Sequence, residues 1–399
     1  MKHILHLHSA FDLGGKEARA VKLMNHFGAA ARHVILSAVP EAIGARAAID
    51  AGIEVEFPGD AAPALYGKPA LGRYLRLARY MQGFDLVLSY NWGAMDGVMA
   101  HRLLAPVMSL PPLIHHEDGF NEDEAVRLNW KRNAFRISAL KGAHALVVPS
   151  VTLEEIAHSV WKQPLGKVHR IANGIDIARY QRSPQPGSFP GLGRQDGDIV
   201  VGTIAGLRAV KNLPRLVRAV AAAGSHIKLA IAGEGPERAA ILAEAARLGI
   251  ADRLAMPGFL CDPASYVGYF DVFALSSDSE QYPISLVEAM AAGLPAVCTD
   301  VGDVRHMVAA ENRRFIIDKA DEAAFARALS ELAADAQLRA DIGAANRALA
   351  AAEYGVEHMF ARYRSLYGSA MKCAEFARQG GGHGLAAESE SAPSWRGDN

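Results

Sequence analysis

Residues 279–298 decide the fold of this chain and read Ser279-Glu-Gln-Tyr-Pro-Ile-Ser-Leu-Val-Glu-Ala-Met-Ala-Ala-Gly-Leu-Pro-Ala-Val-Cys298. The pattern predicts a loop that carries Glu280, a helix that begins near Ile284 and carries Glu288, and a turn into a buried strand. An ordinary loop, helix and strand with surface acids is the alternative interpretation of this segment.

The start of that helix is a candidate anion site. The backbone N–H groups of Ile284, Ser285 and Leu286 have no partners within the helix, and they point out of its first turn. Such a helix start binds anions readily. With a carboxylate on either side, it suits a nucleoside-diphosphate sugar. The amides would take the diphosphate, one carboxylate the sugar hydroxyls and the other the ribose hydroxyls.

Length and composition are those of a globular enzyme. The chain has 399 residues, half of them hydrophobic, which favours two domains rather than one. The net charge of −1 gives no reason to expect a nucleic-acid partner. Three cysteines fit no disulfide framework or metal spacing, and no apolar run is long enough to span a membrane. We therefore expect a cytoplasmic protein.

Short apolar runs alternate with helical segments along the whole chain, which predicts two parallel α/β sheets. The predicted strands are residues 4–8, 34–38, 85–89, 113–116, 145–149, 199–204, 228–232, 272–275 and 296–299. A Pro/Gly/Ser cluster at residues 182–191 interrupts the series and reads as a linker between domains. Two similar halves joined there predict a cleft between them, with ligands at the carboxyl ends of the strands.

Two cations follow the predicted strand 199–204. Gly206 precedes Arg208, and Lys211 lies three residues further on. The two side chains can reach one point together, where they would stabilise the negative charge of a departing diphosphate. A solvated basic loop is the alternative.

Glycines mark two further strand ends. Gly233, Glu234 and Gly235 follow the strand 228–232, and Gly14 and Gly15 follow the first strand and precede a helix predicted over residues 17–27. Glycines permit a close approach of the backbone to a ligand and positive φ angles. Plain tight turns are the alternative for both pairs.

Taken together, these motifs resemble the retaining glycosyltransferases of family 4, also described as glycosyl transferases group 1. That family folds as two facing Rossmann-like domains, the GT-B architecture. The resemblance implies that Arg208 and Lys211 stabilise the leaving diphosphate, that Glu280 binds donor-sugar hydroxyls and that Glu288 binds ribose. It also implies that Gly14, Gly15, Gly206 and residues 233–235 line the donor pocket, and that the segment around Phe259 holds the base.

A histidine near the end of the fourth strand often contacts the transferred sugar in that family. The segment Ile-His-His-Glu-Asp-Gly-Phe at residues 114–120 leaves the register open. His116 is the first choice, His115 the second, and Asp118 is a third occupant of the same position. A departure from the family pattern lies downstream, where Asp303 stands in place of a second glycine and His306 stands where a glutamate is frequent. It leaves the donor-sugar preference open.

The resemblance also implies five segments. These are an acceptor-side domain (1–180), a linker (181–197), a nucleotide-sugar domain (198–352), a helix that crosses back to the first domain (353–372) and a disordered tail (373–399). A simple terminal helix on the second domain is the alternative for the fourth segment.

Basic and aromatic residues on two helices suggest a partner surface. Arg73, Arg76 and Arg79 are spaced to lie near one another, and a second cluster around Arg136 follows. Such helices could seat the enzyme on anionic lipid at the inner face of a membrane. Helices packed on their sheet with solvated arginines are the alternative.

The predicted function is transfer of a sugar from a nucleoside-diphosphate sugar to a glycan, lipid-linked or small-molecule hydroxyl, in polysaccharide or glycolipid synthesis. The resemblance implies that no cofactor or metal is needed, and no Asp-x-Asp pair lies in the motifs to seat a metal beside a diphosphate. Three alternatives remain: a nucleotide-sugar epimerase of the same architecture, a dinucleotide oxidoreductase and a non-catalytic sugar-nucleotide-binding relative. The oxidoreductase would need Gly-x-Gly-x-x-Gly after the first strand, where residues 12–17 do not match.

Overall fold

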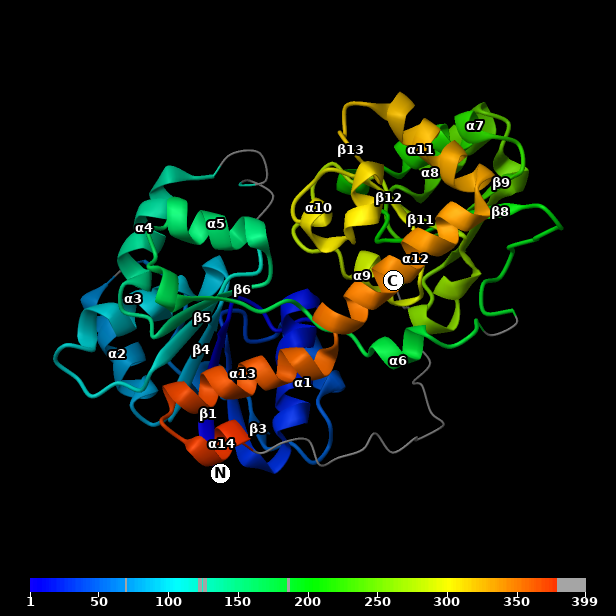
Figure 1. Cartoon of the computed structure of the whole chain (residues 1–399). Coiled ribbons are helices and arrows are strands. Elements are labelled where there is room, and N and C mark those ends of the chain that lie inside the picture. Colours follow the sequence, from blue (N-terminus) through cyan, green and yellow to red (C-terminus); the bar gives the residue numbers. More distant parts are fainter. Residues whose placement is uncertain (69, 121–123, 125–127, 185–186, 379–399) are drawn as a thin grey trace.

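The computed structural model describes residues 1–68, 70–120, 124, 128–184 and 187–378. Its strands form two parallel sheets in separate lobes (Figure 1). The first sheet has the order β3-β2-β1-β4-β5-β6-β7 and the second the order β10-β9-β8-β11-β12-β13. The prediction of two parallel α/β sheets is confirmed.

The strands of the first sheet are β1 (Lys2–His8), β2 (Ala31–Ser37), β3 (Val55–Glu56), β4 (Leu86–Tyr90), β5 (Leu113–His116), β6 (Ala145–Val148) and β7 (Val168–Arg170). Those of the second sheet are β8 (Ile199–Ile204), β9 (Ile227–Ala232), β10 (Leu254–Gly258), β11 (Val272–Leu275), β12 (Ala296–Thr299) and β13 (Ile316–Ile317). Every predicted strand lies on one of these. The sequence analysis missed β3, β7, β10 and β13, which are the edge strands. Edge strands are covered less than central ones, so short or polar sequences suffice there.

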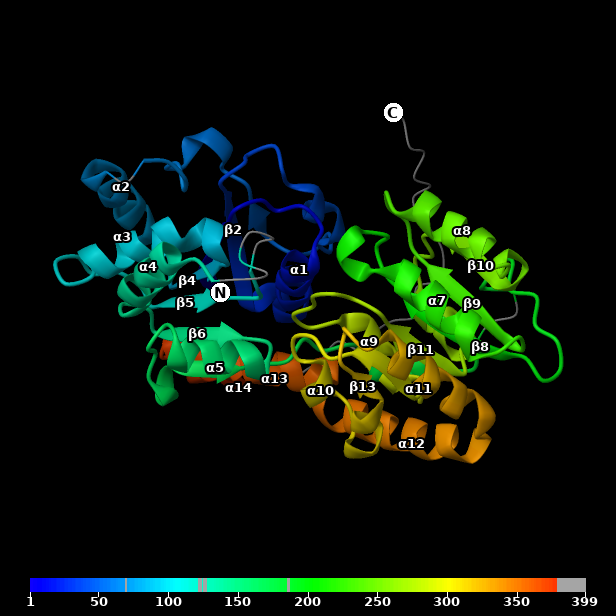
Figure 2. The same cartoon turned by 90° about the horizontal axis from the view of Figure 1, so that it is seen from above.

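Helices cover both faces of each sheet (Figures 1 and 2). The first sheet packs on α1 (Gly15–Phe27), α2 (Leu71–Met81), α3 (Met95–Leu104), α4 (Trp130–Leu140) and α5 (Val151–Ser159). The second packs on α6 (Ile177–Tyr180), α7 (Leu213–Ala223), α8 (Arg238–Arg247), α9 (Ile284–Ala291), α10 (Val304–Met307), α11 (Glu322–Ala334) and α12 (Ala336–Glu353). In β1, Leu5 and Leu7 face the core under α2–α5 while Ile4 faces the other side, which is the period-two alternation of a strand.

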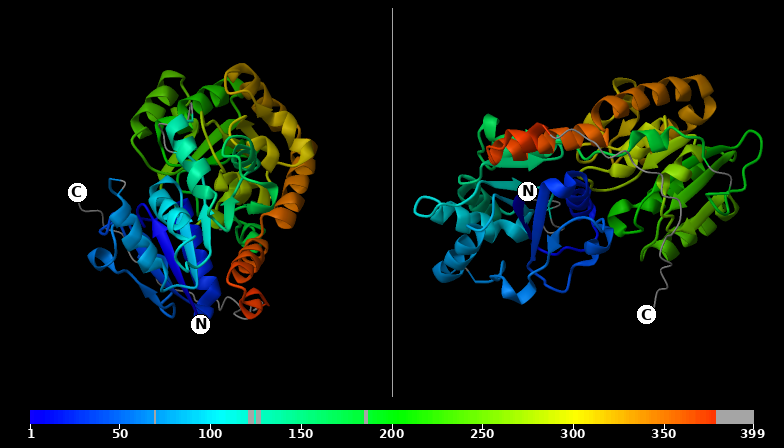
Figure 3. Two further views of the ribbon diagram at one scale, coloured as in Figure 1. Left: turned by 90° about the vertical axis from the view of Figure 1, so that its left-hand side faces the viewer. Right: turned by 90° about the horizontal axis from the view of Figure 1, so that it is seen from below.

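After α12 the chain leaves the second sheet and packs on the first. Helices α13 (Val356–Ala370) and α14 (Ala374–Arg378) cover the face that α1 also covers (Figures 1 and 3). At the crossing, Ile175 exchanges two backbone hydrogen bonds with Tyr354 and Val356, both of 2.9 Å. A Cβ on Gly174 would lie 2.7 Å from the Cα of Val356, so only glycine fits beside this crossing.

Two segment expectations differ from what the structure describes. The disordered tail was expected from residue 373, but α14 forms there and buries Phe376 against the first domain. Residues 379–399 lie outside the described part of the chain. Within the expected linker, Phe189 is buried against Tyr266 and Phe270, so this part belongs to the second core. Residues 185 and 186 of that linker also lie outside the described residues.

Histidines lie inside the first domain, where polar groups are costly. The Nε2 atom of His6 lies 3.0 Å from Nδ1 of His33, and Nδ1 of His6 lies 3.1 Å from the Tyr90 hydroxyl. Burial lowers the pKa of His33 to about 4 and holds the pKa of His6 well below its ordinary value. Both rings are therefore neutral at neutral pH.

This burial predicts a loss of stability in mild acid. Below pH 6.5 the unfolded chain takes up protons that the folded histidines do not, so the free energy of unfolding falls as the pH falls. For His33 alone the loss is about 2 kcal/mol at pH 5. Urea denaturation at pH 7 and pH 5 should show a smaller pH effect in His33→Gln than in the wild type. The exposed His226→Gln is the control, and an unchanged pH effect in His33→Gln would contradict the prediction.

Candidate functional site

Lys211 and Glu280 meet at the carboxyl edge of the second sheet. Lys211 ends the short 3-10 helix η7 (Ala209–Lys211) that follows β8, and Glu280 lies in the loop after β11. The Lys211 Nζ atom lies 2.5 Å from Oε1 of Glu280, and the Ser277 hydroxyl donates to the same oxygen at 2.6 Å. The three side chains line a small pocket together with Ser285 at the start of α9. The structure thus brings together a cation, a carboxylate and a helix N-terminus, as predicted.

The first turn of α9 differs from the prediction in one detail. The helix begins at Ile284 as expected, but the N–H of Leu286 donates to the carbonyl oxygen of Pro283 at 3.1 Å. This 3-10-type bond tightens the first turn and removes one of the three predicted donors. Within the described part of the chain, the N–H groups of Ile284 and Ser285 have no hydrogen-bond acceptor. The anion site therefore has two backbone donors rather than three.

Arg208 lies just before η7 and is exposed. Among the described residues, its guanidinium has no hydrogen-bond or ion-pair partner. The loop that carries it is fixed by its backbone, because Leu207 donates to the carbonyl of Glu234 at 2.8 Å and Glu237 donates to that of Leu207 at 3.0 Å. A charged side chain on a fixed loop is available for a ligand anion.

The glycines after β9 have a packing role. Gly233 and Gly235 have φ of 141° and 153°, and Cβ atoms there would lie 1.9 Å from the carbonyl oxygen of Ala205 and 2.5 Å from that of Leu207. They let the loop after β9 pack against the loop after β8 that carries Gly206 and Arg208. This requirement alone explains both glycines.

The remaining predicted donor-side positions lie at loop ends. Helix α1 begins at Gly15, two residues earlier than expected, with Gly14 as its N-cap. A Cβ on Gly15 would meet open space, whereas one on Gly14 would approach Glu17 to 3.0 Å. Phe259 follows β10 with 72% of its side chain exposed.

Glu288 lies on α9 and contacts the segment that links the domains. The Tyr180 hydroxyl, at the end of α6, donates to Oε1 of Glu288 at 2.8 Å. Burial raises the pKa of Glu288, and the hydrogen bond from Tyr180 partly offsets this. Tyr180 had no signal in the sequence, because only the tertiary fold brings α6 to α9.

The structure does not place His116 at the site. Its side chain is 0% exposed, its Nδ1 lies 3.2 Å from the carbonyl oxygen of Ser89 and its Nε2 lies 2.9 Å from the Tyr367 hydroxyl. Contact with a sugar is therefore excluded in this structure, since α13 covers the ring. His115 is equally buried, with its Nδ1 2.9 Å from the Ser89 hydroxyl.

Asp118, the third choice for this position, is partly exposed and pairs with Arg19 through both carboxylate oxygens, one of them at 2.8 Å. The Arg19 guanidinium is buried between Asp118 and the side chain of Asn173. Of the three candidates, only Asp118 lies where a ligand could reach it.

The expected basic surface is also corrected. Arg73 is buried, pairs with Asp96 at 2.7 Å and donates to the carbonyl oxygens of Leu65 and Gly67. It therefore supports the loop before α2, while Arg76 and Arg79 are exposed. Arg136 of the second cluster is 0% exposed between Glu117 and Glu124. Arg127 lies outside the described residues.

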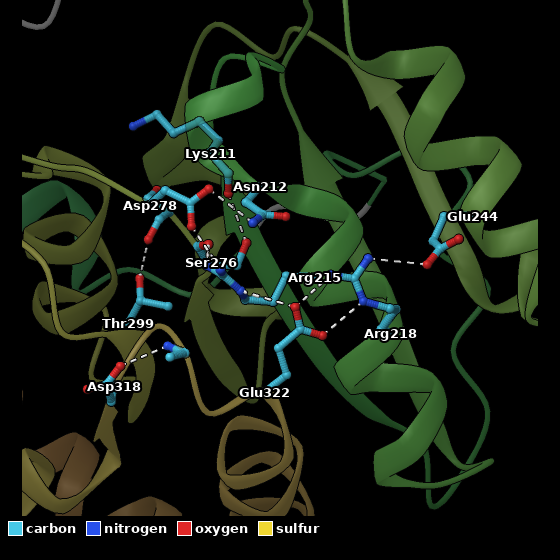
Figure 4. Close-up of polar contacts among 12 residues, drawn as sticks. Lys211, Asn212, Arg215, Arg218, Glu244, Ser276, Asp278, Thr299, Asp318 and Glu322 are labelled. Carbon is cyan, nitrogen blue, oxygen red and sulfur yellow. Dashed lines mark hydrogen bonds and ion pairs between the residues drawn. The ribbon is translucent and has the colours of Figure 1, made fainter. Parts of the chain in front are cut away.

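A buried arginine on α7 holds the loop of Glu280 (Figure 4). Arg215 donates to the carbonyl oxygen of Ser276 at 2.8 Å and pairs with Asp278 at the same distance. The Ser276 hydroxyl donates to the carbonyl oxygen of Lys211 at 3.0 Å. These contacts tie the loop of Glu280 to the backbone of Lys211. In the sequence, the signal for this role is a basic residue inside the apolar pattern of α7.

Removal of Arg215 should destabilise this loop. Arg215→Met would leave the Ser276 carbonyl without its arginine donor and would remove the ion pair with Asp278, which keeps its hydrogen bond from Asn212. The expected cost is about 2 kcal/mol in the free energy of unfolding. Arg218→Met is the matched control on the same helix, because Arg218 pairs with Glu322 and Glu244 and has no bond to the loop (Figure 4). Its more exposed pairs should contribute less than about 1 kcal/mol. Urea denaturation of both variants tests the difference, and equal losses would contradict it.

Two general properties complete the description. Within the described ranges, no helix has the length and apolar character needed to cross a bilayer. The same residues hold no group of three or more His, Cys, Asp or Glu side chains placed to bind a metal ion.

The fold matches that of solved structures, a glycosyltransferase among them. HepE from Anabaena, crystallised in complex with UDP, superposes with a TM-score of 0.74 at 19% identity and covers 92% of this chain and 100% of its own. The glycosyltransferase from Rickettsia africae gives a TM-score of 0.73 at 14% identity over 93% of this chain and 99% of its own. These likenesses confirm the predicted GT-B architecture.

Sequence relatives cover less of the chain. N-acetyl-alpha-D-glucosaminyl L-malate synthase from Bacillus anthracis is 25% identical over 207 residues, 51% of this chain and 54% of its own length. 2-Deoxystreptamine glucosyltransferase from Streptomyces kanamyceticus is 31% identical over 221 residues, 52% and 57% of the two lengths. The chain thus spans about half the length of the curated relatives it matches. Residues 185–349, which include Lys211, Glu280 and Glu288, match the family described as glycosyl transferases group 1.

Proposed function

We propose that this chain is a glycosyltransferase that moves a sugar from a nucleoside-diphosphate sugar to a hydroxyl acceptor. One observation carries the proposal: Lys211, Glu280 and the free amide end of α9 line one pocket at the carboxyl edge of the second sheet. A cation and backbone donors suit a diphosphate, and a carboxylate beside them suits sugar hydroxyls. The match of residues 185–349 to glycosyl transferases group 1 supports it.

The diphosphate would lie between Arg208, Lys211 and the amides of Ile284 and Ser285. When the bond to the sugar breaks, negative charge grows on the departing diphosphate, and these fixed donors stabilise it. Lys211 can contact both Glu280 and the diphosphate, because an ammonium group has three protons and its contact with Glu280 uses one. Glu280 is in turn held by Ser277 and Lys211, so its free oxygen is oriented for the hydroxyls of the donor sugar.

Glu288 would bind the ribose hydroxyls. Its Oε1 accepts from Tyr180, and its second oxygen remains for a hydroxyl of the ligand. The base is expected near the exposed Phe259. Uridine is the first candidate, because HepE, which shares the fold, was crystallised with UDP.

We further propose the mechanism of the resembled family 4, in which the acceptor attacks the face that the nucleotide leaves and the configuration is retained. The leaving phosphate would take the acceptor's proton. No enzyme nucleophile is required in this scheme, and no metal ion.

The acceptor would approach from the first domain, and its identity stays open. The names of the relatives mention L-malate and 2-deoxystreptamine, so the match does not select one acceptor. Glycan, lipid-linked and small-molecule hydroxyls all remain in the proposal. Membrane contact, through exposed residues such as Arg76 and Arg79, stays a prediction.

Donor binding should be visible as thermal stabilisation. UDP, GDP, ADP and their common sugar conjugates are added in turn, and the true donor should raise the melting temperature, since binding to the folded state at about 100 times Kd adds about 2.7 kcal/mol of stability. Lys211→Ala should abolish the shift. Lys228→Ala is the control, because Lys228 lies near the start of β9 and pairs with Asp198 instead. A shift that persists in Lys211→Ala would contradict the assigned site.

Turnover should depend on Glu280. Glu280→Gln keeps the size of the side chain but removes its charge, and it should lower kcat by about 100-fold or more with an unchanged circular dichroism spectrum. Glu331→Gln is the control. Glu331 is an exposed carboxylate on α11 that pairs with Arg314, and its replacement should leave kcat unchanged. Normal transfer by Glu280→Gln would refute the role of Glu280, and net epimerisation of the nucleotide sugar without transfer would favour the epimerase alternative.

A further inference from the structure

The short turn between β12 and α10 joins the two domains through Asp303. This carboxylate is 3% exposed and lies at the N-terminus of α5, a helix of the first domain. Its Oδ2 accepts from the N–H of Val151 at 2.8 Å, and its Oδ1 accepts from both the N–H and the hydroxyl of Thr152, each at 2.8 Å. Figures 1 and 2 show α5 and α10 facing each other between the sheets.

Asp303 completes the cap of α5 from the other domain. The hydroxyl of Ser150, the N-cap residue of α5, accepts from the N–H of Leu153 at 3.1 Å. The two N–H groups that Ser150 leaves are those of Val151 and Thr152, and Asp303 takes both. A carboxylate at a helix N-terminus is also stabilised by the helix dipole. The contact is therefore a specific one and depends on how the domains sit relative to each other.

The other side of the same turn packs against the backbone of Glu280 in the proposed donor site. Gly302, next to Asp303, has a φ of 54°, and a Cβ there would lie 2.2 Å from the carbonyl oxygen of Glu280. The first domain touches this loop directly as well, because a Cβ on Gly119 would lie 2.8 Å from the Gln281 side chain. The turn at Gly302 and Asp303 therefore contacts the backbone of Glu280 on one side and the start of α5 on the other.

We propose that Asp303 is a positioning residue for sugar transfer, which fixes the first domain against the turn that supports Glu280. The inference rests on the proposed function. The side chains and amides assigned to the donor's diphosphate, sugar and ribose are Arg208, Lys211, Glu280, Glu288 and the start of α9, all in the second domain. Of the expected donor pocket, only the backbone at Gly14 and Gly15 lies in the first domain. Transfer also needs an acceptor on the first domain, aligned with the sugar that Glu280 holds. A change at Asp303 should therefore lower kcat without a large change in nucleotide affinity.

This inference also explains the departure from the family pattern. The side chain at position 303 points to α5 of the first domain, away from the Lys211–Glu280 pocket. A second glycine at this position would leave the N–H groups of Val151 and Thr152 without this acceptor. The Asp303 side chain thus contributes to the alignment of the domains. It does not itself reach the donor sugar, so it does not set the donor-sugar preference.

The test is a comparison of kcat with nucleotide affinity. Asp303→Asn keeps the shape but turns an NH2 group or a weaker acceptor toward the two backbone donors, so kcat should fall about 10- to 100-fold, as for a misaligned reacting pair. The Kd for UDP, or for whichever nucleotide the thermal panel selects, should stay within about twofold. Asp321→Asn is the matched control, since Asp321 caps α11 within the second domain by accepting from Ala324 at 2.8 Å. It should change neither quantity.

Thr152→Val approaches the same contact from the first domain and removes only the hydroxyl. Its loss in kcat should be smaller, and the double variant with Asp303→Asn should lose no more than Asp303→Asn alone, because both changes remove one interaction. This arm also decides the matter if Asp303→Asn does not fold.

Small-angle X-ray scattering tests the contact without any assay of activity. Asp303→Ala should increase the radius of gyration relative to the wild type and to Asp321→Ala, because the domains are then free to separate. If the wild type transfers no sugar, the proposed function fails while the scattering still decides on the contact. Unchanged scattering and unchanged kcat in the Asp303 variants, or parallel losses of kcat and UDP affinity, would overturn the proposal.

Discussion

The site depends on the adjacency of β8, β11 and β12 in one parallel sheet. Parallel strands end at the same edge, so the loops that follow them meet even though they are far apart in the sequence. The loop after β8 brings Arg208 and Lys211, the loop after β11 brings Glu280, and the turn after β12 brings Gly302 and Asp303. The contacts among Lys211, Glu280 and Gly302 follow from this arrangement.

Three contacts then convert adjacency into a fixed geometry. Arg215 holds the carbonyl oxygen of Ser276, the Ser276 hydroxyl holds the backbone of Lys211, and Lys211 meets Glu280. Opposite charges at close range cost little when each also has hydrogen-bond partners, and Ser277 supplies one for Glu280. The pocket is therefore preorganised before a ligand arrives, which is the condition under which fixed donors stabilise developing charge.

The second domain is tied to the first at several points of different character. The chain crosses twice, before α6 and before α13, and α13 covers the first sheet with buried aromatic rings. Tyr180 joins the crossing segment to Glu288, and Asp303 joins the donor-side turn to α5. Tyr180 thus contacts Glu288 directly, and Gly302, next to Asp303, packs against the carbonyl oxygen of Glu280, so the residues that join the domains adjoin the proposed nucleotide-binding residues.

Local patterns in the sequence were sufficient for the elements and for much of the pocket. Apolar runs predicted the central strands, since a strand buried on both faces must be apolar. Glu280, the start of α9 and Lys211 were predicted from their spacing together with the family resemblance. Short edge strands such as β3 and β13 were missed, because two residues carry no periodic signal.

Only the tertiary structure decided the environment of each polar side chain. His116 and Arg73 look like site and surface residues in the sequence, yet α13 covers the first, and Asp96 with two backbone carbonyls holds the second. Asp303 was read as a change in the donor pocket, and the fold turns it toward the other domain. The sequence by itself determined two parallel sheets and the residues at the ends of their strands. Which of those residues face a ligand, a core or another domain was decided by helix packing, because burial and hydrogen-bond partners come from segments distant in the chain.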